Sequence, residues 1–152
     1  MNVLPLPVAI WINARGRFAA HPEDGLSLQD CRIANAVRCV PPQNRPTGGE
    51  IATCRRFLND ELSAEPAPRV VLALGRIAWD SVLRTLGHSV GRHPFAHEAV
   101  AELPQGPILV GTYHTSRYNV NTGRLTAEMF ERAMVRAAAL VRLSAPEPRR
   151  RR

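Results

Sequence analysis

The clearest pattern of apolar positions lies in the middle of the chain. Residues 70–74 read Val-Val-Leu-Ala-Leu, a continuous apolar run typical of a strand that is buried on both faces of a parallel sheet. Gly75 follows, and the segment from Ile77 to Leu86 has the spacing of an amphipathic helix. These residues therefore predict a strand, a tight glycine turn and a helix in direct succession.

A second helix is predicted upstream of this strand. Thr47 and Glu50 form a capping box, in which each side chain satisfies a backbone donor at the start of a helix. Apolar residues then recur at helical spacing, so that Cys54 points inward with the rest of the apolar face. That face consists of Ile51, Cys54, Leu58 and Leu62.

Two more strands and a final helix complete the pattern. Strands are predicted for Arg32–Cys39 and Ile108–Val110, and a helix for Ala127 to about Leu143. The alternation of strands and helices predicts an α/β fold with a mostly parallel central sheet and helices on both faces. Ligands in such folds bind beyond the carboxyl ends of the strands. We therefore expect the loops after the first and third strands and the turn at Gly75 to share one edge.

The stretch from Gly111 to Thr126 is longer and more polar than a chain reversal requires. It holds one His, one Ser, two Tyr, two Asn and two Arg, and functional groups concentrate in loops that rigid elements hold in place. His114 directly follows a strand end, where an imidazole could donate to an oxygen that gains negative charge. A structural or merely exposed histidine is the alternative. Ser116 and Arg117 beside it could hold a phosphate.

Asn35 is a polar side chain in the middle of the strand predicted for residues 32–39. A buried amide costs stability unless it is paired, so neighbouring backbone could satisfy it. Alternatively, the amide faces the functional edge and reads a planar base, accepting from one ring position and donating to the adjacent carbonyl. Residue type alone leaves both interpretations open.

Cys39 and Cys54 are candidate metal ligands with fourteen residues between them. Zinc or an iron–sulfur cluster normally takes four ligands, so the pair would be half a site, and two buried structural cysteines are an equal alternative. Cys31 has no recognisable ligand spacing. The odd count of three cysteines argues against a secreted disulfide framework.

Length and charge change this interpretation little. The chain of 152 residues suffices for one domain with its own core, and all 20 of its basic residues are Arg. Four of the seven net positive charges belong to the last four residues, so the body carries +3, which suits nucleic acid without requiring it. The apolar residues 1–12 are interrupted by Pro5 and Pro7 and are too short to span a bilayer. We expect a soluble, cytoplasmic protein.

Several segments, taken together and in order, match one family over roughly residues 25–142. They are Asn35-Ala36-Val37-Arg38-Cys39-Val40-Pro41-Pro42, Cys54 on its helix, the run VVLALGRIA from Val70 to Ala78, Tyr113-His114-Thr115-Ser116-Arg117-Tyr118-Asn119, and Asn121-Thr122-Gly123-Arg124-Leu125-Thr126. With these segments the chain resembles the iron–sulfur uracil-DNA glycosylases of the family 5 type. Thr115 stands where that family usually has Val or Pro.

The resemblance implies base excision, in which a damaged base is extruded from the duplex and its N-glycosidic bond is hydrolysed to leave an abasic site. By this match, His114 would stabilise the negative charge of the departing uracil. Asn35 would recognise the flipped base. Ser116, Arg117 and Asn119 would lie in the loop that meets the DNA.

The resemblance also implies that Cys39 and Cys54 are two of four ligands to a 4Fe-4S cluster that orders the DNA-binding surface. Family members carry two more cluster cysteines, a glycine- and proline-containing motif and a stacking aromatic further upstream, and none of these is found in residues 1–25. We therefore expect an irregular or drifted N-terminus at 1–25 and a glycosylase-like domain without the family's N-terminal third at 26–143. A disordered Arg-rich tail is expected at 144–152.

Two hypotheses about function follow. The first is a DNA-repair glycosylase acting on DNA that contains uracil or other deaminated bases, with no membrane partner. The second is an inactive glycosylase remnant that acts at most as a DNA-binding module. Cleavage of a uracil-containing oligonucleotide separates the two.

Overall fold

The computed structural model describes residues 14–15, 21, 23, 25, 27–28, 30–39 and 42–144. Contacts divide the chain into two compact units, Met1–Ala34 and Asn35–Arg152. In the described part of the first unit, the short strands β1 (Ala14–Arg15) and β2 (Ser27–Leu28) pair antiparallel. The second unit holds the described helices and a separate sheet.

The second unit is organised around a three-stranded sheet with the order β3-β5-β4. Its strands are β3 (Val70–Leu74), β4 (Val100–Glu102) and β5 (Ile108–Thr112). β3 runs parallel to β5, whereas β4 runs antiparallel to it. The central strand β5 is buried along most of its length, as a strand covered on both faces must be.

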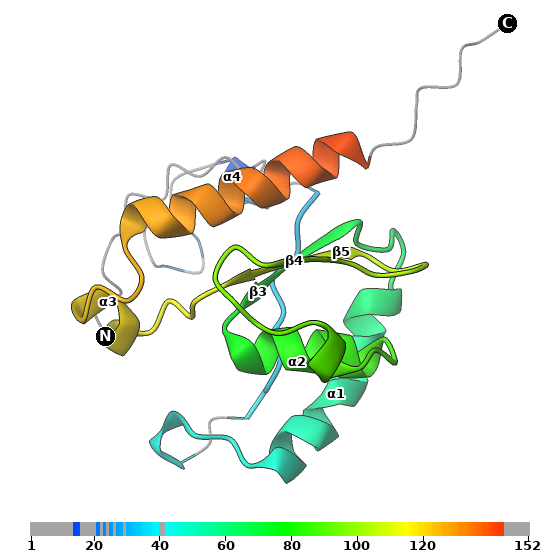
Figure 1. Cartoon of the computed structure of the whole chain (residues 1–152), viewed down its shortest axis with the longest axis horizontal. Helices are drawn as coiled ribbons and strands as arrows, with labels where there is room; N and C mark the ends of the chain where they lie inside the picture. The colour runs from blue at the N-terminus through cyan, green and yellow to red at the C-terminus, as the bar shows by residue number, and fades with distance from the viewer. Residues whose placement is uncertain are drawn as a thin grey trace, which may run out of the picture. The chain divides into compact units, whose positions relative to one another are not determined.

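Helices cover both faces of this sheet. The helices are α1 (Gly48–Ser63), α2 (Arg76–Thr85), the short α3 (Arg117–Asn121) and α4 (Ala127–Leu143), with two 3-10 turns, η1 (Pro42–Asn44) and η2 (Val90–Arg92). α2 packs on β3 and α1 packs on α2, while α4 contacts β3 and β5. In Figure 1, α4 lies on one side of the sheet and α1 and α2 lie on the other. The predicted α/β class is confirmed; the described sheet is mixed, with one parallel and one antiparallel pairing, where a mostly parallel sheet was predicted.

The core lies between the sheet and α2, and Trp79 is its largest buried side chain. The indole Nε1 of Trp79 donates a hydrogen bond to the backbone oxygen of His93 (2.8 Å), so the polar atom of the ring is satisfied. Gly111 on β5 makes room for this ring. A Cβ at position 111 would lie 3.1 Å from Cε3 of Trp79 and 2.8 Å from the backbone oxygen of Ala96.

The predicted capping box and helices are confirmed. At the start of α1, Thr47 N donates to Oε2 of Glu50 (2.7 Å), and Glu50 N donates to Oγ1 of Thr47 (3.3 Å). The hydrogen bonds from Thr47 lower the pKa of the Glu50 carboxyl group. Cys54 is buried, as its place on the apolar face predicts. Both α2 and α4 begin and end within one residue of their predicted bounds.

The strand predicted for residues 32–39 is wrong. Residues 31–39 form no strand pairing, and the Ile33 side chain is 80% exposed. A run of β-prone residues becomes a strand only where another strand offers backbone partners, and no described strand pairs with this segment. Asn35 is therefore an exposed residue and not a buried strand amide. α3 lies in the stretch 111–126 that was predicted as a loop, and β4 lies in a segment for which no strand was predicted.

The ends of the chain add little to this description. Most of the predicted N-terminal stretch 1–25 and nearly all of the predicted tail 144–152 lie outside the described residues. Ser144, the C-cap of α4, donates from its backbone N to the oxygen of Leu140 (3.0 Å). No helix in the described part of the chain is long and apolar enough to cross a membrane.

We expect Gly111→Ala to lower the free energy of unfolding by about 1 to 3 kcal/mol, because the added Cβ would overlap the Trp79 ring and the Ala96 oxygen. Gly48→Ala is the matched control, since a Cβ at the start of α1 meets nothing within 4 Å. Chemical denaturation of both variants measures the difference. Equal stabilities would contradict the close packing of Trp79 against β5.

Candidate functional site

Gly75 and His114 meet at the edge of the sheet where β3 and β5 end. The parallel register pairs Leu74 with Thr112, and Gly75 N donates to the oxygen of Thr112 (2.7 Å). Gly75 has a φ of +90°, and a Cβ there would lie 3.1 Å from Cβ of His114. Only glycine suits that backbone and this close approach, so the turn after β3 forms a wall against His114.

His114 has an exposed side chain on a fixed backbone. Nδ2 of Asn119 donates to the backbone oxygen of His114 (2.8 Å). The backbone N of Asn119 donates to Oγ of Ser116 (3.4 Å), which caps α3, and its oxygen accepts from Leu125 N (3.0 Å). Asn119 therefore braces the polar loop at both ends. Arg117, the first residue of α3, is exposed beside it.

A row of aromatic rings lies next to this loop, and the sequence analysis missed it. Tyr113 stacks on His97 with ring centroids 5.1 Å apart and ring planes 21° apart. Phe95 meets Tyr113 edge-on at 6.3 Å, and Trp79 meets Phe95 at 6.0 Å. Cζ of Arg124 lies 5.0 Å from the centroid of the Tyr113 ring. The available signal was the group of aromatic and His residues in a segment without helical or strand periodicity.

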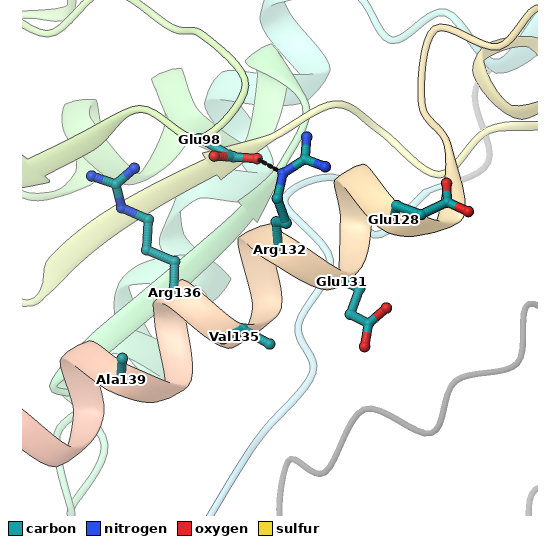
Figure 2. Close-up of a pocket in the computed structure, with 7 residues that line it drawn as sticks. All are labelled: Glu98, Glu128, Glu131, Arg132, Val135, Arg136 and Ala139. Atoms are coloured by element: carbon teal, nitrogen blue, oxygen red, sulfur yellow. Dashed lines mark hydrogen bonds and ion pairs between the residues drawn. The ribbon is translucent and has the colours of Figure 1, made fainter.

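His97 links this row to β5 and α4. Its Nδ1 lies 3.2 Å from Oγ1 of Thr112, which is completely buried at the end of β5. Its Nε2 lies 3.4 Å from Oε1 of Glu98, which also accepts a hydrogen bond from Nε of Arg132 on α4 (3.0 Å). Figure 2 shows the Glu98 and Arg132 side chains turned toward each other. Through His97, the segment that carries Tyr113 and His114 therefore contacts both β5 and, by way of Glu98, α4.

A shallow hollow lies along the exposed side of α4 (Figure 2). Its lining consists of Glu98, Glu128, Glu131, Arg132, Val135, Arg136 and Ala139. Acidic and basic side chains mix there, so its charge favours neither an anion nor a cation. Neither His114 nor the two cysteines predicted as ligands line it.

Cys39 and Cys54 come together, as a shared metal site requires. The Cys54 thiol lies close enough to that of Cys39 to raise its pKa, and Arg38 N donates to Sγ of Cys54 (3.4 Å). Partial desolvation raises the pKa of the Cys39 thiol, and the Cys54 sulfur and the Glu50 carboxylate raise it further. A metal would have to displace the Cys39 proton, because the thiolate is the form that binds metal.

The described residues supply two ligands of such a site and not four. Within the described ranges, no three side chains of His, Cys, Asp or Glu gather into a metal-binding group. Cys31, in the first unit, is a half-buried free thiol that donates to the oxygen of Arg32 (3.8 Å), and burial raises its pKa. The cysteine pair therefore fits half of a tetrahedral zinc or iron–sulfur site.

Asn35 lies in the unpaired segment that leads to Cys39, and its side chain is exposed. Within the part of the chain that the structure describes, no hydrogen bond joins it to His114. Its amide is thus open to a ligand. That Asn35 and His114 act on one base stays a prediction.

The family model described as the uracil DNA glycosylase superfamily matches residues 9–138. This match includes Asn35, both cysteines of the pair and the His114 loop. It begins within the stretch 1–25 that the sequence analysis set apart.

Three type-5 uracil-DNA glycosylases are similar to this chain. The protein from Thermus thermophilus is 44% identical over 122 residues, which cover 80% of this chain and 56% of that protein. The one from Pyrobaculum aerophilum is 41% identical over 122 residues, covering 80% and 52%, and the one from Mycobacterium leprae is 46% identical over 111 residues, covering 71% and 48%. The chain spans about half the length of these curated relatives.

We expect Asn119→Ala to loosen His114 without unfolding the sheet, because it removes the side-chain donor to the His114 oxygen. Loss of one such bond costs about 0.5 to 1.5 kcal/mol. The ring resonances of His114 in NMR spectra should shift or broaden. Thr122→Val is the control, since Oγ1 of Thr122 bonds to the oxygen of Tyr118 (2.7 Å) in the same helix. Equal spectral changes in both variants would refute the brace.

Proposed function

This chain belongs to the uracil DNA glycosylase superfamily, and we propose that it excises uracil from DNA by hydrolysing the N-glycosidic bond between base and deoxyribose. Relatives of 41–46% identity that are named type-5 uracil-DNA glycosylases support the proposal. The products are free uracil and an abasic site. A base inside a duplex must be extruded first, which costs about a few kcal/mol and least at a mispair. A G·U pair is therefore the easier substrate.

The chemistry defines what the protein must supply. When the bond between C1′ of the sugar and N1 of uracil breaks, its electron pair leaves with the base and the sugar becomes oxocarbenium-like. Water then adds to C1′ and gives up a proton. Because the departing uracil gains negative charge, a donor fixed toward its ring oxygens lowers the barrier more than it stabilises the bound substrate.

His114 is the residue that we give this role. Its imidazole is exposed at the end of β5, while the backbone of the residue is held by Asn119 and backed by Gly75. The approach of His114 to Gly75 is the observation that carries the proposal, since it places the imidazole at the edge where ligands bind in α/β folds. An imidazole N–H there donates to uracil more strongly as charge builds up.

Asn35 is proposed to recognise the extruded base. Its exposed amide can accept from a ring N–H of uracil and donate to the adjacent carbonyl, a pairing that cytosine does not offer. Ser116 and Arg117 at the start of α3 are proposed to meet the DNA. Asn119 contributes indirectly in this scheme, because its amide is engaged with the His114 oxygen.

Cys39 and Cys54 are proposed as two ligands of a 4Fe-4S cluster. The proximity of their thiols supports this, and so does the hydrogen bond from Arg38 N to Sγ of Cys54, since N–H donors to sulfur stabilise cluster thiolates. When bound, the cluster would serve as a structural cross-link and not as a redox centre. It would hold the segment that carries Asn35 against α1.

We expect His114→Ala to slow uracil release from a duplex oligonucleotide by roughly 30- to 1,000-fold, because removing an oxyanion-type donor costs about 2 to 4 kcal/mol. Alkali cleavage of the abasic product measures the rate. His88→Ala is the matched control, a half-buried histidine outside the proposed site. Equal rates in wild type and His114→Ala would exclude this role, and no release by wild type would favour the DNA-binding remnant.

We expect Cys39→Ser to abolish retention of iron and sulfide after anaerobic reconstitution, because it removes one cluster ligand. Cys31→Ser should keep both, since the Cys31 thiol donates to the oxygen of its neighbour Arg32 and its position has no recognisable ligand spacing. Iron and sulfide assays and visible absorption of the purified chain measure the outcome. Iron retained by Cys39→Ser, or a colourless wild-type protein, would count against the cluster.

A further inference from the structure

We infer that Arg76 and Arg124 bind phosphates of the DNA backbone at the edge of the sheet that carries His114; this inference rests on the proposed function. Arg76 follows Gly75 in the chain, and Arg124 contacts the ring of Tyr113, the residue before His114. Each arginine is therefore close to one side of the contact between Gly75 and His114. Both are exposed.

Arg124 is held in place by an aromatic face. Its Cζ lies 5.0 Å from the centroid of the Tyr113 ring. A guanidinium placed over an aromatic ring keeps the N–H donors that point away from the ring, and these remain available to an anion. The cation–π contact also reduces the side-chain freedom that phosphate binding would otherwise have to remove.

Arg76 is held in a similar way on the neighbouring ring. Its Cζ lies 5.7 Å from the centroid of Phe95, and Phe95 lies 6.3 Å from Tyr113. Arg76 is also the first residue of α2, whose first turn contains no acidic residue and whose N-cap, Gly75, has no side chain that could accept from the first N–H groups. The positive end of this helix therefore adds to the charge of Arg76.

Neither guanidinium is matched by a carboxylate in the described part of the chain. The ion pairs that arginines form there join Arg38 to Glu61 (3.1 Å) and Arg132 to Glu98 (3.0 Å), and neither Arg76 nor Arg124 takes part. Two unmatched guanidinium groups on adjoining rings form a basic pair beside His114. Such groups bind phosphate oxygens bidentately, so the chemistry fits a DNA backbone.

The test measures binding of the full chain to a short, uracil-free DNA duplex by fluorescence anisotropy between about 50 and 200 mM salt. If each arginine neutralises one phosphate, Arg76→Gln and Arg124→Gln should each reduce the slope of log K against log salt by about 0.9, and the double variant by about 1.8. Arg124→Lys keeps the charge and should keep most of the slope, which separates lost charge from lost packing.

Arg84→Gln is the control, since it removes the same charge from the exposed last turn of the same helix. Its slope should equal that of wild type. Slopes in Arg76→Gln and Arg124→Gln that match Arg84→Gln would overturn the inference, as would wild-type protein without salt-dependent DNA binding. Uracil release is measured separately. Reduced slopes without any uracil release would uphold the inference and reject the proposed activity, whereas release with unchanged slopes would do the reverse.

Discussion

The parallel pairing of β3 with β5 is the constraint on which the site depends. The register that joins Val70 to Ile108 ends at Leu74 and Thr112, so both strands stop at the same level of the sheet. Gly75, the residue after β3, then donates from its backbone N to the oxygen of Thr112, the last residue of β5. A slip of this register would separate Gly75 from His114, because strand positions alternate between the two faces of a sheet.

The backbone of His114 is held by its neighbours, whereas its side chain is exposed to solvent. Asn119 holds the carbonyl, Gly75 stands against Cβ, and the stacked rings of Tyr113 and His97 fix the preceding residue. A donor that is oriented in advance stabilises developing charge without reorganising when the bond breaks. Asn119 and Tyr113, which support His114, belong to the same polar loop, whereas Gly75 and His97 come from other segments of the chain. Such support from several segments is typical of a site at the edge of a rigid scaffold.

The elements that could be predicted from the sequence are those with a local signal. The capping box at Thr47 predicts a helix and the apolar run at 70–74 predicts a buried strand without reference to the rest of the chain, and α1 and β3 form there. The strand predicted for 32–39 failed because pairing depends on a partner that the segment does not find. The stacking of His97 on Tyr113 joins residues 16 positions apart, and no periodicity encodes such a contact. The spacing of Cys39 and Cys54 left a shared metal site and two separate structural cysteines equally open, and only the family resemblance favoured their proximity.

The position of Trp79 gives the protein an intrinsic optical reporter. The indole is 1% exposed, its N–H is engaged with the His93 oxygen, and it meets the ring of Phe95, which in turn meets Tyr113. Its emission wavelength therefore depends on an enclosed, apolar environment that extends to the residue before His114. The chain has two tryptophans, and the other, Trp11, lies outside the described residues. With Trp11 replaced by phenylalanine, fluorescence from the single remaining indole would report on the packing of this region without an added label.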